Sequence, residues 1–477
     1  MKKHKFMSLL LTICIAAAAF IVPVYASDTA DAGYDWNACA SEVQEAFLSM
    51  SEETSDSLEV SPEYLSRSYE ANRFYDSILN YIENTPGELR EHFSGAYVND
   101  DGYLVVLLCC LAEADRCQSF ILNDLDCENA LFEVGNGSYY ETKKTLDAVN
   151  AGIAQLQEQV RSTDVTDADA AALMDAYPRT VVDEENNTIS VVLKVSPDVE
   201  SAVQKSNAIS RNRTSASLSE SENKAVSVYN DYIQDFKAYV GDWETVEYEA
   251  SSESAQILHE ATEWRPGRSI FVVTGIFDNT VYGNQCSTGY RALYRKDGRT
   301  YRGYVTCGHG NNIGNSVYLS TDTQSANKIG IIQDRQFGGT VDASFISINN
   351  AGVTSSNAIY YTSSQPGVTK PGIVLDGTQT TVAKNSLIYK SGQTTYLTQG
   401  RVFNTSVSGY NSDIYFYDMI QADRAMTDSG DSGGVTYICD GDTIYGKAVG
   451  IVGGKINNLS VFIKASNIRS VFGPDAY

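Results

Sequence analysis

The stretch from residue 270 to residue 463 most constrains the fold, because it consists of short runs of β-forming residues with almost no helical periodicity. Typical runs are residues 270–273, 301–306 and 414–420, and Gly, Asn, Asp and Ser separate them. Closely spaced strands with turn-forming residues between them are typical of a β-sandwich or a β-barrel. The sequence therefore predicts an all-β domain of about 210 residues near the C-terminus.

The charge of the chain changes near the start of this domain. Residues 268–477 contain 17 Lys and Arg, 14 Asp and no Glu, for a net charge of +3, whereas residues 1–267 carry a net charge of −28. Such an asymmetry usually separates segments with different tasks. We interpret it as an acidic region that docks on a mildly basic domain. Two unrelated domains with different surfaces are the alternative.

The first 26 residues have the pattern of a secretory signal peptide. Three lysines among the first five residues supply the positive start, residues 6–22 are apolar, and Val24-Tyr25-Ala26 forms a small-residue cleavage site. An uncleaved membrane anchor is the alternative, but the cleavage site argues against it. We therefore expect a secreted, extracellular protein without a membrane attachment once residues 1–26 are removed.

Residues 27–267 contain two similar stretches that predict α+β structure. Residues 96–107 and 180–193 each consist of a strand pattern, an acidic turn and a second strand pattern, which predicts a β-hairpin. A helical pattern follows each hairpin, over residues 141–160 and 219–240. We interpret this acidic region as two related subdomains, each built from a hairpin and a helix.

The β domain contains a serine flanked by glycines, in Gly430-Asp431-Ser432-Gly433-Gly434. A serine hydroxyl is a good nucleophile only when a base removes its proton and an oxyanion site takes the developing charge. Because glycine has no Cβ, the backbone N–H of Gly430 can point into such a site together with that of Ser432. The alternative is a polar turn between two strands.

His309 is the only histidine of the β domain, so it is the one candidate base for a serine mechanism there. The third residue must be a carboxylate that orients the imidazole. Asp342 opens an apolar strand, and a buried aspartate needs a partner. Asp334 is the alternative, but the adjacent Arg335 suggests a surface ion pair.

These segments resemble the chymotrypsin-like serine proteases of the trypsin superfamily, and most closely the secreted bacterial branch that includes alpha-lytic protease and the streptogrisins. The order His309, Asp342, Ser432 is the order of that family. Residues 286–290 resemble its early strand, and residues 449–454 resemble the strand that lines its specificity pocket. The resemblance implies an all-β protease domain of two six-stranded antiparallel β-barrels, with His309, Asp342 and Ser432 as the catalytic residues and Gly430 and Ser432 as the oxyanion hole.

The resemblance also implies a serine endopeptidase made as a zymogen. The acidic residues 27–267 would be a pro-region that assists folding and inhibits residues 268–477 until it is cleaved off. The expected partners are protein or peptide substrates and this pro-region, with no nucleic acid. The expected enzyme uses neither a metal nor an organic cofactor.

This sequence departs from the family pattern at the cysteines and in the specificity pocket. The family has a cysteine directly after the histidine, but here Gly310 follows His309 and the cysteine is Cys307, so a disulfide with Cys286 remains a candidate. Gly453 stands where the family has a serine that bonds the aspartate. The resemblance assigns substrate binding to five pocket residues: Met426, Thr427, Val452, Gly453 and Gly454.

None of these pocket residues is charged, so cleavage after Arg or Lys is not expected, and the extra pocket histidine of glutamate-specific relatives is absent. Two other functions use the same residues: a non-catalytic binding protein on a protease scaffold, and an esterase. An α/β-hydrolase is disfavoured, because it needs Gly-x-Ser-x-Gly between a strand and a helix and a histidine that comes last in the chain.

Overall fold

The computed structural model describes residues 61–477, with gaps. The undescribed positions are 110, 162–177, 184–186, 213–216, 244–245, 252–268, 278–279, 320–322, 324–327, 350–356, 358, 360–373, 412 and 440–444. The predicted signal peptide lies outside the described residues. None of the described helices is both long and apolar enough to cross a membrane.

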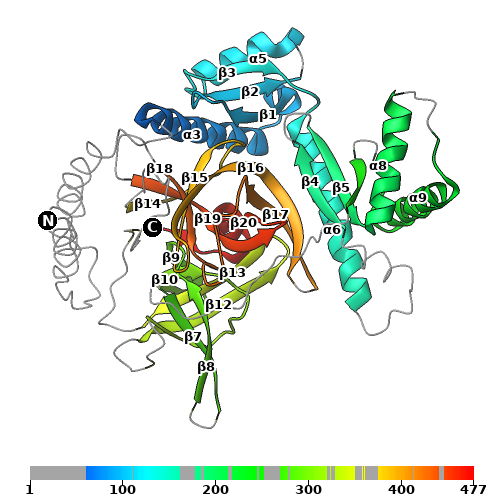
Figure 1. Cartoon of the computed structure of the whole chain (residues 1–477). Coiled ribbons are helices and arrows are strands. Elements are labelled where there is room, and N and C mark those ends of the chain that lie inside the picture. The colour runs from blue at the N-terminus through cyan, green and yellow to red at the C-terminus, as the bar shows by residue number, and fades with distance from the viewer. Residues whose placement is uncertain are drawn as a thin grey trace, which may run out of the picture.

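The first N-terminal subdomain packs helices against a three-stranded sheet (Figure 1). Ser61 caps the first helix by accepting a hydrogen bond of 3.2 Å from the backbone N–H of Tyr64. The predicted hairpin of residues 96–107 is present, and a third strand runs parallel to its second strand. The elements are α3 (Pro62–Asn84), α4 (Glu88–His92), β1 (Phe93–Val98), β2 (Leu104–Leu108), α5 (Leu111–Asn123) and β3 (Leu131–Val134).

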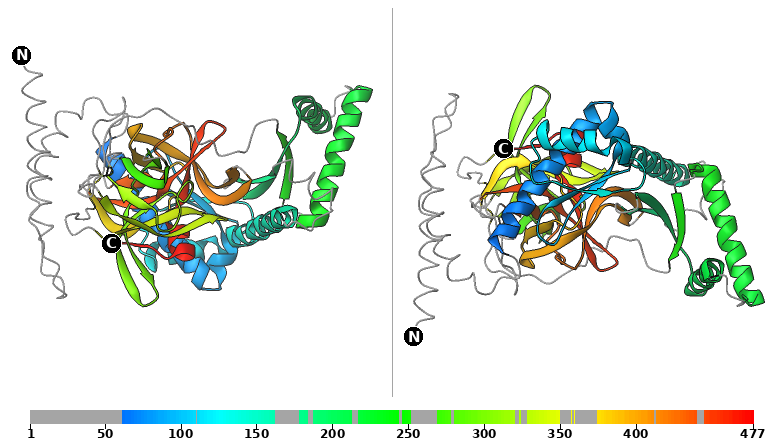
Figure 2. Two further views of the ribbon diagram at one scale, coloured as in Figure 1. Left: turned by 90° about the horizontal axis from the view of Figure 1, so that it is seen from below. Right: turned by 90° about the horizontal axis from the view of Figure 1, so that it is seen from above.

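The second subdomain repeats this order of pairing. The predicted hairpin of residues 180–193 is present and antiparallel, and a third strand again runs parallel to its second strand, but this third strand was not predicted. The helix predicted after the first hairpin, α6 (Tyr139–Arg161), packs in the core of the second subdomain. Helices α8 and α9 stand away from the rest of the molecule in both views of Figure 2. The elements are α6 (Tyr139–Arg161), β4 (Arg179–Asp183), β5 (Thr188–Lys194), α8 (Pro197–Asn212), α9 (Glu220–Val240) and β6 (Val246–Ser251).

The first barrel of the C-terminal part is an eight-stranded sheet in which one bent stretch of chain joins the last strand of the sheet back to its second strand. The sheet order is β21-β9-β10-β13-β12-β11-β7-β8, and β8 leads into β9 through residues 288–290. The N–H of Gly289 and the carbonyl of Tyr290 bond to Val305 at this corner. The strands are β7 (Ser269–Phe277), β8 (Thr280–Ser287), β9 (Arg291–Lys296), β10 (Arg299–Thr306), β11 (Ser316–Tyr318), β12 (Lys328–Gly338), β13 (Val341–Ile348) and β21 (Asp475–Ala476).

The second barrel closes through backbone pairing. Its sheet order is β15-β18-β19-β20-β17-β16, and β16 pairs again with β15, which gives six strands in a ring. The predicted all-β class with two barrels is confirmed. The second barrel has the six strands that were predicted, whereas the sheet of the first has eight. The strands are β15 (Leu387–Gly392), β16 (Tyr396–Asn411), β17 (Ile414–Ala422), β18 (Val435–Cys439), β19 (Tyr445–Ile456) and β20 (Leu459–Lys464), with β14 (Val374–Gln379) beside β19 and a C-terminal helix, α10 (Ala465–Asn467) and η3 (Ile468–Phe472).

The second N-terminal subdomain continues the sheet of the second barrel. Strand β4 pairs with β16 at Val181 and Val407, so β4, β5 and β6 extend the sheet outward. A buried polar group reinforces this junction: the Thr180 N–H donates to Ser408 Oγ at 2.6 Å, and Thr180 Oγ1 donates to Asn150 Oδ1 at 2.9 Å. The two parts therefore share backbone pairing as well as side-chain contacts.

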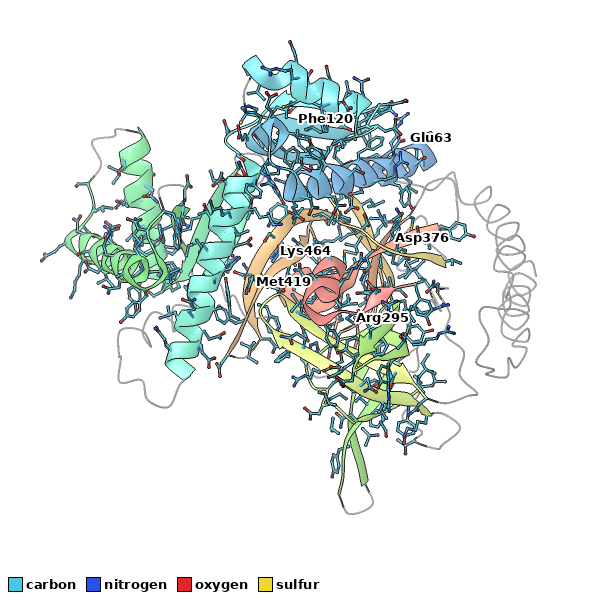
Figure 3. All side chains as sticks on the ribbon, turned by 180° about the vertical axis from the view of Figure 1, so that it is seen from behind. Glu63, Phe120, Arg295, Asp376, Met419 and Lys464 are labelled. Carbon is cyan, nitrogen blue, oxygen red and sulfur yellow. The ribbon has the colours of Figure 1, made fainter. Side chains whose placement is uncertain are left out.

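The first subdomain docks on the same barrel through helix α3. Asn72 is buried, and its Oδ1 accepts from the Ala383 N–H and from Ser386 Oγ, both at 2.9 Å. Asp76 accepts from Thr381 Oγ1 at 2.9 Å. Figure 3 shows this subdomain, with Glu63 and Phe120 labelled, lying over the barrel that carries Met419 and Lys464.

Candidate active site

The predicted base and carboxylate lie next to each other. Nδ1 of His309 is 2.6 Å from Oδ2 of Asp342, and the backbone N–H groups of Gly308 and His309 donate to Asp342 Oδ1 at 2.7 and 2.8 Å. His309 follows β10 and Asp342 opens β13, and β10 and β13 are neighbours in the first barrel. Asp342 is therefore held by three donors, although Gly453 cannot supply the serine that the family uses.

The geometry fixes one tautomer of the imidazole. With Nδ1 bonded to a carboxylate, the proton of neutral His309 lies on Nδ1, and Nε2 is the unprotonated nitrogen that can act as a base. Burial of the ring favours the neutral form, but the charge of Asp342 and its hydrogen bond outweigh burial and raise the pKa of His309. The side chain keeps 17% of its surface exposed, so a substrate can approach it.

The alternative carboxylate, Asp334, has other partners. It lies on β12, where its carboxylate accepts a hydrogen bond from Tyr294 OH at 2.5 Å and pairs with Lys296. Both partners are on β9. Arg335 does not pair with it through its guanidinium, which instead donates from Nε to the Gly308 carbonyl at 2.6 Å. Arg335 thus supports the turn that carries His309.

The turn that carries Ser432 is bonded to the first barrel. The Ser432 carbonyl accepts from the Ser287 N–H at 2.8 Å, and Ser287 Oγ donates to the Gly430 carbonyl at 2.8 Å. Gly433 lies against the end of β10, where an added Cβ would be 2.4 Å from Thr306 Oγ1 and 2.6 Å from the Cys307 nitrogen. The missing side chain of Gly433 thus brings Ser432, which is partly exposed, beside the segment that leads to His309.

The backbone at Gly430 and Ser432 suits an oxyanion site. Gly430 has φ +91°, a conformation that favours glycine, and an added Cβ there would be 2.5 Å from Gln393 Nε2. Within the described part of the chain, no group accepts a hydrogen bond from the N–H of Gly430 or Ser432. Two donors beside a serine hydroxyl form the arrangement that stabilises a tetrahedral intermediate.

A buried ion pair lies directly behind the turn of residues 430–434, called the nucleophile turn below because it carries the candidate nucleophile Ser432. Lys390 Nζ is 3.0 Å from Asp431 Oδ2, and both side chains are fully buried. Asp431 also accepts from the Thr394 N–H at 2.8 Å, Thr395 Oγ1 at 2.6 Å and the Asp428 N–H at 2.9 Å. These bonds tie residue 431 to Asp428 and to the segment of residues 394–395, and thereby hold the adjacent Ser432 in place.

Sequence reasoning missed Ser287, Lys390 and Thr395. Lys390 closes an apolar run, Leu387-Ile388-Tyr389, and gives no local sign that its side chain points inward to a carboxylate 41 positions later. Ser287 lay within the segment that resembles the early strand of the family, which was the only available signal. Its two contacts with the nucleophile turn depend on how the barrels pack.

The predicted pocket residues differ in where they point. The Met426 side chain is buried among Val402, Ile420 and other apolar residues of the second barrel, so only its backbone can face a substrate. Val452 bonds through its backbone to both Gly433 and Gly434, which places β19 beside the nucleophile turn. Thr427, Gly453 and Gly454 lie further along these two segments and are nearly buried.

The two candidate disulfide cysteines are neighbouring free thiols in this structure. Cys286 and Cys307 are both buried, and a hydrogen bond between them is the main cause of the raised pKa of Cys307. The disulfide remains a prediction, with its two sulfurs already close together. Among the described residues, no three His, Cys, Asp or Glu side chains gather as a metal site would require.

Two antiparallel β-barrels, with His309 and Asp342 on one and the Ser432 turn on the other, define a chymotrypsin-like fold. The C-terminal part is similar to three solved bacterial proteases, each aligned over 44% of this chain. They are a glutamic acid specific serine protease that uses a histidine triad in substrate binding (21% identity, 99% of its chain, TM-score 0.34), Nocardiopsis protease (18%, 97%, 0.34) and Thermobifida fusca protease A (19%, 96%, 0.33). Comparison with models of protein families and with curated proteins finds no match.

Proposed function

We propose that this protein is a secreted serine endopeptidase, made as a zymogen with residues 27–267 as its pro-region. The observation that carries the proposal is the 2.6 Å contact between His309 Nδ1 and Asp342 Oδ2 beside the Ser432 turn. Ser432 attacks the peptide carbonyl, and His309 Nε2 takes the proton and returns it to the leaving amine. Asp342 stabilises the imidazolium, and the N–H groups of Gly430 and Ser432 stabilise the oxyanion.

The acidic region supports the zymogen part of the proposal. It is bonded to the protease barrel at several places, among them the β4–β16 pairing and the Asn72 contacts of α3. A segment that extends the barrel's own sheet can assist the folding of that barrel and stay bound to it after cleavage. The signal pattern of residues 1–26 favours export, where a Cys286–Cys307 disulfide would be stable.

The test is labelling of the processed protein with a fluorophosphonate probe, compared with the Ser432→Ala variant. Labelling that Ser432→Ala abolishes, together with cleavage of an unstructured protein such as casein, is the expected result. N-terminal sequencing of both secreted forms then locates the processing site and shows whether processing is autocatalytic. Failure of correctly processed protein to react with the probe contradicts the proposal, and activity on esters but on no peptide indicates an esterase.

A further inference from the structure

Two buried hydroxyls lie where the resemblance places the inner end of the specificity pocket. Ser460 Oγ accepts from the backbone N–H of Met426 at 2.7 Å and of Thr427 at 3.1 Å. It is also 2.9 Å from Thr427 Oγ1. Ser460 is fully buried and Thr427 is 4% exposed, so these two side chains fill the space between β20 and the segment before the nucleophile turn.

Thr427 also reaches the opposite side of the pocket. Its Oγ1 lies 3.5 Å from the carbonyl oxygen of Gly454, which is on β19. The resemblance makes residues 426–429 one wall of the pocket and the end of β19 the other, and a substrate side chain would enter between them. The backbone bonds of Val452 to Gly433 and Gly434 place β19 beside Ser432. A side chain that spans from one wall to the other closes the pocket at that depth.

A second contact joins the same walls nearer the solvent. Lys455 Nζ lies 3.5 Å from Asp428 Oδ1, with the two side chains 20% and 43% exposed. Lys455 and Ser460 are paired residues of the β19–β20 hairpin. The Lys455–Asp428 ion pair is more exposed than the two hydroxyls, so it lies nearer the solvent. The walls are therefore bridged twice.

The charges at this place compensate each other. Lys455 and Asp428 form a pair, and the inner layer offers only hydroxyl groups. An acidic side chain would meet the Asp428 carboxylate, and a basic one would meet the Lys455 ammonium. Neither sign of charge therefore finds an unpaired counterion in this pair, which favours an uncharged side chain.

We propose that Thr427, Ser460, Lys455 and Asp428 reduce the specificity pocket to a shallow site that takes a short, uncharged side chain, such as alanine or serine, on the acyl side of the cleaved bond. This inference rests on the proposed function. Thr427 and Lys455 limit the depth of the pocket, because the side chain of each reaches across from its own wall to a residue of the opposite wall.

The first test uses processed enzyme and tetrapeptide p-nitroanilides that differ only in their last residue. We expect kcat/KM for alanine to exceed that for phenylalanine, lysine and glutamate by about tenfold or more, since a side chain without room loses its transition-state contacts. A best substrate that ends in phenylalanine, lysine or glutamate overturns the inference.

The second test opens the pocket with the double variant Thr427→Gly/Lys455→Gly. The readout is the ratio of kcat/KM for phenylalanine to that for alanine, which we expect to rise about tenfold or more. Lys447→Gly, on the same strand β19 but beside Tyr69, is the matched control and should leave the ratio unchanged. An unchanged ratio in the double variant overturns the inference, because the bridging side chains would then not limit the depth.

Fluorophosphonate labelling separates this inference from the proposed function. Each enzyme is titrated with the probe, so that kcat/KM refers to active molecules only. An enzyme that reacts with the probe but prefers a large or charged residue contradicts the pocket while the serine mechanism stands. A protein that never reacts with the probe removes the proposed function, and this inference with it.

Discussion

Lys390 Nζ lies 3.0 Å from Asp431 Oδ2 with both side chains fully buried, one residue before Ser432. Removing one partner leaves the other charge buried without compensation, which costs about 3–5 kcal/mol. We therefore expect Lys390→Met, in a full-length Ser432→Ala background that prevents autolysis, to lower the free energy of unfolding by about that amount. Denaturant unfolding measures it. Lys447→Met, on strand β19 of the same barrel, is the control, and an equal loss there would contradict a special role for Lys390.

The same pair predicts an alkaline limit to activity. Burial lowers the pKa of Lys390 below its usual 10.5, although the charge of Asp431 opposes this shift. The ammonium is the form that pairs with Asp431, so activity should fall as the pH rises towards 10.5 and Lys390 loses its proton. Lys390→Arg should retain more activity at high pH, because a guanidinium does not titrate there. Identical alkaline limbs in the two proteins would show that another group sets the limit.

The acid limb of the pH profile should reflect His309. The neutral imidazole is the active base, and Asp342 raises the pKa of His309 above its usual 6.5. Activity should therefore rise with pH through a midpoint above 6.5, measured as kcat/KM against pH. Asp342→Asn should lower both the rate and this midpoint, since only burial then acts on the ring. A midpoint that Asp342→Asn leaves unchanged would argue against the pairing.

Gly433→Ala should separate steric contact from backbone strain. Gly433 has φ +81°, and its added Cβ would collide with Thr306 Oγ1 and the Cys307 nitrogen. Gly314 has a similar φ of +88° with nothing within 4 Å, so Gly314→Ala carries the backbone strain alone, about 1–2 kcal/mol. We expect Gly433→Ala to lose more stability than Gly314→Ala and to lose fluorophosphonate labelling. Equal effects of the two substitutions would mean that the close approach of Gly433 to β10 is unimportant.

Asn72→Ala should loosen the docking of helix α3 on the protease barrel. It removes the acceptor for the Ala383 N–H and for Ser386 Oγ, and leaves these buried donors unsatisfied at a cost of about 1–3 kcal/mol. Thermal unfolding of the full-length Ser432→Ala protein measures the loss. Asn80→Ala, on the exposed face of the same helix, should change the melting temperature little. If both variants melt alike, the Asn72 contacts do not hold the two parts together.

The barrels and the residues of the site were predictable because each depends on local signals. Closely spaced β runs and turn residues indicated the strands, and His309, Asp342 and Ser432 stood in recognisable motifs. The Lys390–Asp431 pair was not predictable, because it depends on which strand end faces which turn. The parallel strands β3 and β6 and helix α8 were also missed, and β3 is short and largely exposed.

Strand β16 has one edge that is shared between the enzyme and its N-terminal region. Residues 396–401 of that edge pair with β15, whereas Val407 pairs with β4. Under the proposed processing, removal of residues 27–267 would leave Val407 without its β4 partner on this side. An unpaired strand edge is a template for other strands. If residues 27–267 are cleaved off as proposed, the time for which they stay bound would therefore decide when this edge can pair with a second molecule.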